Sequence, residues 1–93
     1  MQPATIQTVS TLAETRTVRL PDGTSVTLNH YSSLSYPERF KSDDREVELS
    51  GEAYFEVSKD SKHPFIVQTE TIDVQVLGTH FNVDAYPDNP DVK

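Results

Sequence analysis

The chain has 93 residues, of which 34% are hydrophobic, and its 8 basic and 15 acidic residues give a formal net charge of −7 at pH 7. A chain of this length forms at most one domain. Nucleic acids and anionic membrane surfaces attract clustered Lys and Arg, so this acidic chain with scattered basic residues is not expected to bind either. Because cysteine is absent, a disulfide scaffold, a thiolate metal site and a Cys nucleophile are excluded. We expect neither a membrane span nor a signal peptide after Met1.

Alternation of apolar and polar residues with a period of two dominates the chain and predicts β-strands that each bury one face. The first two strands, at 18–20 and 26–28, flank the segment Leu20-Pro21-Asp22-Gly23-Thr24. Pro, Asp and Gly in this order favour a turn, so the two strands are expected to form a hairpin. Five more strands are predicted from the same alternation, at 47–49, 53–57, 65–67, 72–76 and 81–85.

Polar and glycine-containing segments separate the predicted strands. Ser50-Gly51 predicts a tight turn or a bulge, residues 59–63 predict a polar loop, and Gly78 predicts a bulge or a corner. No window has the apolar periodicity of a stable helix, and the nearest approach is a short 3₁₀ or α turn predicted for residues 36–40. The proline-containing tail, 87–93, is expected to be a loop.

Strands that recur every 8–12 residues predict an all-β fold, with curled antiparallel sheets that form a two-layer sandwich or a short solenoid-like β domain. Residues 1–93 are expected to form a single domain with its core at about 13–86. Phe55, Phe65 and Phe81 fall on the apolar phase of their strands and are predicted to lie in this core.

Residue types that catalyse reactions or bind metals are present, but they do not form patterns typical of a site. His30, His63 and His80 are not spaced as metal ligands on one element would be. No serine lies in a G-x-S-x-G motif, and loop acids such as Asp43-Asp44 need a cleft that a small two-layer domain hardly offers. We therefore expect no enzyme activity, no metal and no cofactor.

The most informative outward residue is Tyr54, which falls between Glu52 and Glu56 on the polar phase of its strand. Aromatic residues are enriched in protein interfaces, so these three residues are the candidates for contact with another protein. The alternative is structural: Tyr54 covers a second layer or packs over a loop, with its hydroxyl hydrogen-bonded.

Six segments in a fixed order resemble the FecR-type family of anti-sigma regulators, in the form common among Bacteroides-like bacteria. The resemblance covers residues 13 to 86, and its specificity comes from the order and spacing of the segments. They are Thr17–Thr24, Val26–Asn29, Arg45–Leu49, Gly51–Val57, Pro64–Val67 and Val76–Val83.

The resemblance implies a periplasmic sensor module of a protein that spans the inner membrane once. In such proteins a cytoplasmic region, absent from this chain, controls an extracytoplasmic-function sigma factor. The periplasmic part receives a signal from the signalling domain of a TonB-dependent outer-membrane receptor, which is the expected partner here. The family motifs look structural and imply no active site.

Comparison with the family pattern gives one further expectation, which concerns the C-terminal side of the chain. The family usually continues beyond Val83–Tyr86 with another strand, so the chain is expected to be truncated at its C-terminal side and to leave a sheet edge unpaired.

Two other functions stay open at this point: a structural spacer, and a glycan-binding module that uses the outward aromatics Tyr36, Tyr54 and Tyr86.

Overall fold

The computed structural model describes residues 5–40 and 43–86, and this part of the chain is built from strands and connecting turns without a helix. The all-β expectation is therefore confirmed. The eight strands are β1 (Ile6–Ser10), β2 (Arg16–Arg19), β3 (Ser25–Leu28), β4 (Ser33–Pro37), β5 (Arg45–Glu56), β6 (Phe65–Gln68), β7 (Asp73–Val76) and β8 (His80–Ala85).

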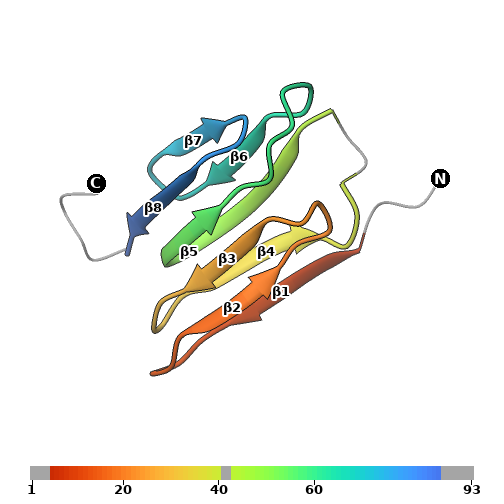
Figure 1. Cartoon of the computed structure of the whole chain (residues 1–93). Helices are drawn as coiled ribbons and strands as arrows, with labels where there is room; N and C mark the ends of the chain where they lie inside the picture. Colours follow the sequence, from red (N-terminus) through yellow and green to blue (C-terminus); the bar gives the residue numbers. More distant parts are fainter. Residues whose placement is uncertain (1–4, 41–42, 87–93) are drawn as a thin grey trace.

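The strands form two layers that share the long strand β5 (Figure 1). The first sheet has the order β1-β4-β5-β6-β7 and uses the first half of β5, which pairs with β4 and, in parallel, with β6. The second sheet has the order β2-β3-β5-β8 and uses the second half of β5. The eight strands are thus one hydrogen-bonded sheet folded over β5, in agreement with the predicted curled, two-layer form.

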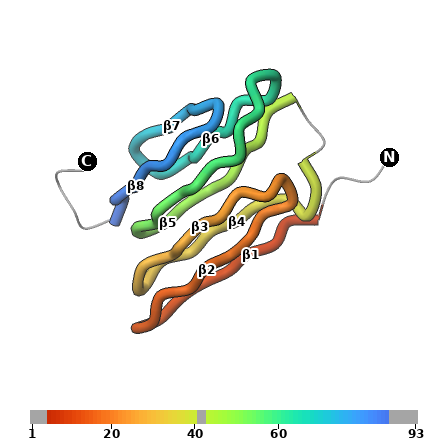
Figure 2. The backbone as a smooth tube through the Cα atoms, in the orientation of Figure 1, coloured from red at the N-terminus to blue at the C-terminus, as the bar shows by residue number. Residues whose placement is uncertain are grey.

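At one end of the molecule, here called the arch end, the chain crosses three times between the layers, at 11–15, at 29–32 and at the bend of β5 (Figure 2). The three crossings are hydrogen-bonded to one another. Ser32 N donates to Thr11 Oγ1 (3.0 Å), and Glu52 N donates to Ser32 Oγ (2.9 Å). Gly51 sits at the bend with φ +94°, and a Cβ there would overlap the Ser32 side chain. Only glycine satisfies both the left-handed backbone and this close approach.

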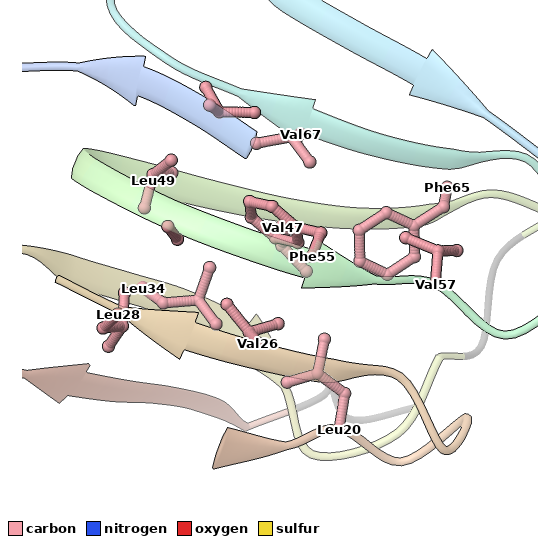
Figure 3. Close-up of a cluster of buried hydrophobic side chains, with 12 residues drawn as sticks. Leu20, Val26, Leu28, Leu34, Val47, Leu49, Phe55, Val57, Phe65 and Val67 are labelled. Carbon is pink, nitrogen blue, oxygen red and sulfur yellow. The ribbon is translucent and has the colours of Figure 1, made fainter. Parts of the chain in front are cut away.

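Apolar side chains from both layers meet between the sheets (Figure 3). Phe55 is central, since its ring contacts Phe65 edge-on at 6.1 Å and stacks on Phe81 at 5.2 Å. Phe55 and Phe65 are fully buried and Phe81 is partly buried, so the three predicted core phenylalanines do lie in the core. The other buried apolar residues are Leu20, Val26, Leu28, Leu34, Val47, Leu49, Ala53, Val57, Val67 and Val83.

At the opposite end, here called the loop end, the buried side chain of Arg45 joins three connections. Its Nε donates to His63 O (2.7 Å), and Nη1 donates to Asp22 Oδ2 (2.7 Å) and to Ser58 O (2.8 Å). Its Nη2 faces the carbonyl oxygens of Asp60 (3.4 Å) and Leu77 (3.2 Å). All five N–H donors of the guanidinium are therefore used, which compensates for removing a charge from water.

The carboxylate of Asp22 extends this network into the β2–β3 turn. Its Oδ1 accepts from Thr24 N (3.0 Å) and its Oδ2 from Thr24 Oγ1 (2.7 Å). Thr24 Oγ1 in turn accepts from Ser58 N (3.1 Å), on the loop that follows β5. The turn residues predicted from the sequence thus form the expected hairpin, in which Gly23 has φ +89°. They also hold the buried arginine.

Several predictions about segments need correction. Strands β1 and β4 were not expected, because neither Ile6–Ser10 nor Ser33–Pro37 has a clear two-residue alternation. The short helical turn predicted at 36–40 is wrong, since Tyr36 and Pro37 end strand β4. The break predicted at Ser50-Gly51 is a bend within one continuous strand, β5. The predicted tail loop, 87–93, lies outside the described residues.

Replacement of Arg45 by Met should lower the free energy of unfolding by about 3–5 kcal/mol, because the half-buried carboxylate of Asp22 loses its positive partner and four carbonyl oxygens lose the hydrogen bond that Arg45 donates. The matched control is Arg19→Met, which removes an exposed arginine from β2 and should change stability by less than about 0.5 kcal/mol. Chemical denaturation followed by circular dichroism measures both. Equal effects of the two substitutions would show that Arg45 does not hold the loop end.

Candidate functional site

The outer face of the second sheet carries the residues predicted for protein contact. The registers of β2, β3, β5 and β8 align Thr17, Thr27, Tyr54 and Asn82 in one row across this face. Tyr54 is 40% exposed, and its ring meets the ring of His80 edge-on at 6.4 Å. The ring therefore points outward from the sheet and does not cover a second layer.

The two glutamates beside Tyr54 differ in their surroundings. Glu56 is exposed, in register with Ser25 on β3 and His80 on β8. Glu52 is half-buried, and both of its carboxylate oxygens accept amide hydrogens, from Asn29 Nδ2 (2.9 Å) and Asn82 Nδ2 (2.7 Å). These bonds, that from Asn82 first and that from Asn29 second, hold the pKa of Glu52 below its ordinary value. Glu52 thus ties β5 to β8 and to the residue that follows β3, and it is charged at neutral pH.

A group of aromatic side chains lies at the arch end, next to Glu52. The His30 ring stacks on that of Tyr86 (6.3 Å, 26°) and meets that of Tyr31 edge-on (6.1 Å, 83°). Tyr86 Oη also donates to His30 O (2.8 Å). Tyr31 is 65% exposed, and its backbone N–H donates to the carbonyl of Leu12, which is 70% exposed.

Sequence reasoning missed Tyr31 and Leu12. Both lie in turns, where the alternation of apolar and polar residues does not predict which side chains face the core and which face the solvent. It also placed Tyr36 among the outward aromatics, and this is wrong, since Tyr36 packs partly buried against the core. The faulty strand assignment at 36–40 explains the error. With β4 recognised, Tyr36 shares the inward phase of Leu34.

A cavity of about 540 Å³ opens at the loop end beside Arg45. Four of the charged or titratable side chains that line this cavity already interact with one another. Arg45 binds Asp22, and His63 Nδ1 lies 2.8 Å from Asp60 Oδ2. The bond from His63 is the main reason that the pKa of Asp60 lies below its ordinary value. Among the described residues no three His, Cys, Asp or Glu side chains are placed to hold a metal ion.

Comparison with known proteins identifies the family. The family model described as FecR protein matches residues 7–93. The chain belongs to the FecR family. This confirms the resemblance carried by the six sequence segments.

Two crystal structures of a candidate anti-sigma factor from Parabacteroides distasonis ATCC 8503 are similar to the FecR chain. One has a TM-score of 0.90 and 46% identity, with 91% of this chain and 40% of that chain covered. The other has a TM-score of 0.88 and 48% identity, with 89% and 40% covered. The FecR chain thus spans about two fifths of the length of these relatives. No curated protein matches it.

In the FecR chain, the features that the structure brings together suit contact better than chemistry. The buried charges, Arg45 with Asp22, bond to the fold itself, and so do both oxygens of Glu52. Tyr54, Glu56, Tyr31 and Leu12 are exposed on one sheet face and on the adjoining end. Exposed Tyr side chains of this kind are frequent anchors of protein interfaces.

The amide bonds to Glu52 give a testable pH dependence. Since folding lowers the pKa of Glu52, its contribution to stability is present above the ordinary glutamate value and is lost as the pH falls through the lowered value. Asn82→Ala should raise the pKa of Glu52 toward its ordinary value, and Asn29→Ala should raise it less. Carboxyl-detected NMR titration measures the shift, with Thr27→Ala as the control. An unchanged pKa in Asn82→Ala would contradict the assignment of its cause.

Proposed function

We propose that this FecR chain is a non-catalytic signalling module of an anti-sigma regulator, and that it works by contact with other proteins. The observation that carries the proposal is the family match over residues 7–93, joined by the fold and the 46–48% identity shared with a candidate anti-sigma factor. The outward aromatic residues on a rigid β scaffold support the contact role.

The proposed location is the periplasm, as a domain of a protein that spans the inner membrane once. Within residues 5–40 and 43–86, no helix is long and apolar enough to cross a membrane. The module would receive its signal from the signalling domain of a TonB-dependent outer-membrane receptor. Any contact with a sigma factor would belong to a cytoplasmic region outside this chain.

We also propose that the domain continues with a further strand beyond β8. The second sheet has four strands and the first has five, so the inner side chains of β7, Val74 and Val76, lack a facing strand and are only partly buried. Among the described strands, β8 pairs with β5 alone, which leaves its outer edge open. A strand added there would pair with β8 and cover β7.

The domain proposal predicts that a chain extended beyond Lys93 is more stable than residues 1–93. Burying Val74 and Val76 should raise the melting temperature by several degrees, because each buried aliphatic side chain adds about 1–2 kcal/mol. Differential scanning calorimetry on the two chains measures this. The same melting temperature for both chains would contradict the proposal.

A glycan-binding role is the second candidate, favoured by the exposed ring of Tyr54 amid polar neighbours. It is weaker than the protein-contact role because Tyr36 turns inward and Tyr86 is covered by His30. A spacer role would need reach alone, and the scaffold extends 37 Å along its longest axis. Thermal-shift screening against glycans distinguishes the glycan-binding role from the protein-contact role. Deleting the module while preserving its reach distinguishes the spacer role from the protein-contact role.

The main proposal predicts direct binding between the whole regulator and the purified signalling domain of its receptor. Tyr54→Thr, which keeps the strand propensity, should weaken this binding about tenfold, equivalent to about 1.4 kcal/mol. Isothermal titration calorimetry measures both dissociation constants, and Thr17→Ser on the same row is the control. Absence of binding by the wild-type regulator would count against the receptor as partner.

A further inference from the structure

Tyr31 adopts an unusual backbone conformation that its packing does not explain. Its φ is +50°, and it is the one non-glycine residue of the described chain in the left-handed region. That conformation costs an ordinary L-residue free energy, and Asn or Gly adopts it more readily. The tyrosine side chain is 65% exposed, so burial in the core offers no compensation. A backbone outlier at an exposed side chain gives a reason to test that side chain for a function.

Leu12 and Tyr31 form the centre of an exposed apolar patch. The bond from Tyr31 N to Leu12 O is 2.7 Å long and brings the two crossings of the arch end together. The ring contacts of His30 with Tyr31 and Tyr86 extend the patch over a third segment, the end of β8. We call Leu12, His30, Tyr31 and Tyr86 the arch-end patch.

The arch end has an excess of carboxylates. The strand directions put Glu14, Glu52, Glu70, Asp73 and Asp84 at this end, and these five residues are here called the acidic rim. Bonds from backbone N–H groups hold the pKa of Glu14 below its ordinary value, as the asparagine amides do for Glu52. Arg16 is the one Arg or Lys of the described residues at this end, whereas the loop end has Arg19, Arg39, Arg45, Lys59 and Lys62.

One carboxylate oxygen at this corner has no hydrogen bond to any residue of 5–40 or 43–86. It is Asp84 Oδ1, which is inaccessible to solvent; Asp84 is in register with Glu52 and lies two residues before Tyr86. A buried acceptor without a donor costs about 1–3 kcal/mol. The corner next to the patch therefore has an excess of negative charge.

We propose that the arch-end patch is the docking surface for a folded protein partner that presents an apolar side chain flanked by Arg or Lys. The apolar side chain contacts Leu12 and Tyr31, a guanidinium stacks on the exposed tyrosine ring, and the acidic rim attracts the remaining positive charge. This inference rests on the proposed function, and it adds to the face that carries Tyr54 a second surface through which the module meets the receptor's signalling domain.

Tyr31→Asn tests the proposal with little risk of unfolding, because Asn tolerates the left-handed conformation. The variant should be at least as stable as the wild type and should bind the purified signalling domain at least tenfold more weakly. Ile6→Thr is the matched control: Ile6 is 61% exposed on β1 at the loop end, and its replacement should leave affinity unchanged. Calorimetric titration of the whole regulator gives the affinities, and thermal unfolding gives the stability.

A second variant tests the charge part of the proposal. Glu14→Gln combined with Glu70→Gln keeps the shapes of both side chains and removes two charges of the rim. Affinity should fall about threefold to tenfold at low salt, and the dependence of affinity on salt should become weaker than in the wild type.

The outcomes separate this proposal from the function on which it rests. If the wild type binds the signalling domain and Tyr31→Asn binds it equally well, the docking surface is wrong and the proposed function stands. If the wild type does not bind at all, both are wrong. If sedimentation shows that the wild type is a dimer and Tyr31→Asn a monomer, the patch pairs two copies of this chain, and the heterologous partner is excluded.

Discussion

The buried guanidinium of Arg45 is the interaction on which the two-layer arrangement depends at the loop end. It is the first residue of β5, the strand shared by both sheets, and its donors reach the β2–β3 turn, the β5–β6 loop and the β7–β8 turn. A domain of this size buries a modest apolar core, so its loops need other restraints. One side chain with five directed donors supplies them for three connections. Its Cζ also lies 5.4 Å from the ring centre of Phe65, which links this network to the core.

The other end is restrained differently, by a stack of backbone crossings bonded through Thr11, Ser32 and Glu52. At the loop end, Arg45 joins the connections beside a cavity of about 540 Å³, whereas the arch end presents exposed Leu12 and Tyr31 and a rim of carboxylates. The two ends of the molecule therefore differ: the loop end is held by a buried ionic network, and the arch end exposes apolar side chains beside carboxylates.

The sequence predicted the parts of the fold that depend on alternation and turn residues. The β2–β3 hairpin followed from Pro21-Asp22-Gly23, and the core phenylalanines followed from their phase. It failed at β1 and β4, where Ser and Thr replace apolar residues and pairing with neighbours decides the conformation. For the candidate site, Tyr54 was placed correctly on the outer face. Tyr31 was missed because its position is set by contacts between chain crossings that are distant in sequence. The role of Arg45 was missed because most of its acceptors are backbone carbonyl oxygens, which every residue has and which the pattern of side chains therefore does not reveal.

The central claim is that the scaffold is held at the loop end and meets its partner at the arch end. Hydrogen exchange of the whole regulator, measured with and without the receptor's signalling domain, tests it most directly. The account predicts slower exchange at backbone amides near 12–16 and 30–32 in the complex, with no change in the loop at 57–64. Protection confined to the loop end, or none at the arch end in a sample that is fully bound, would contradict it.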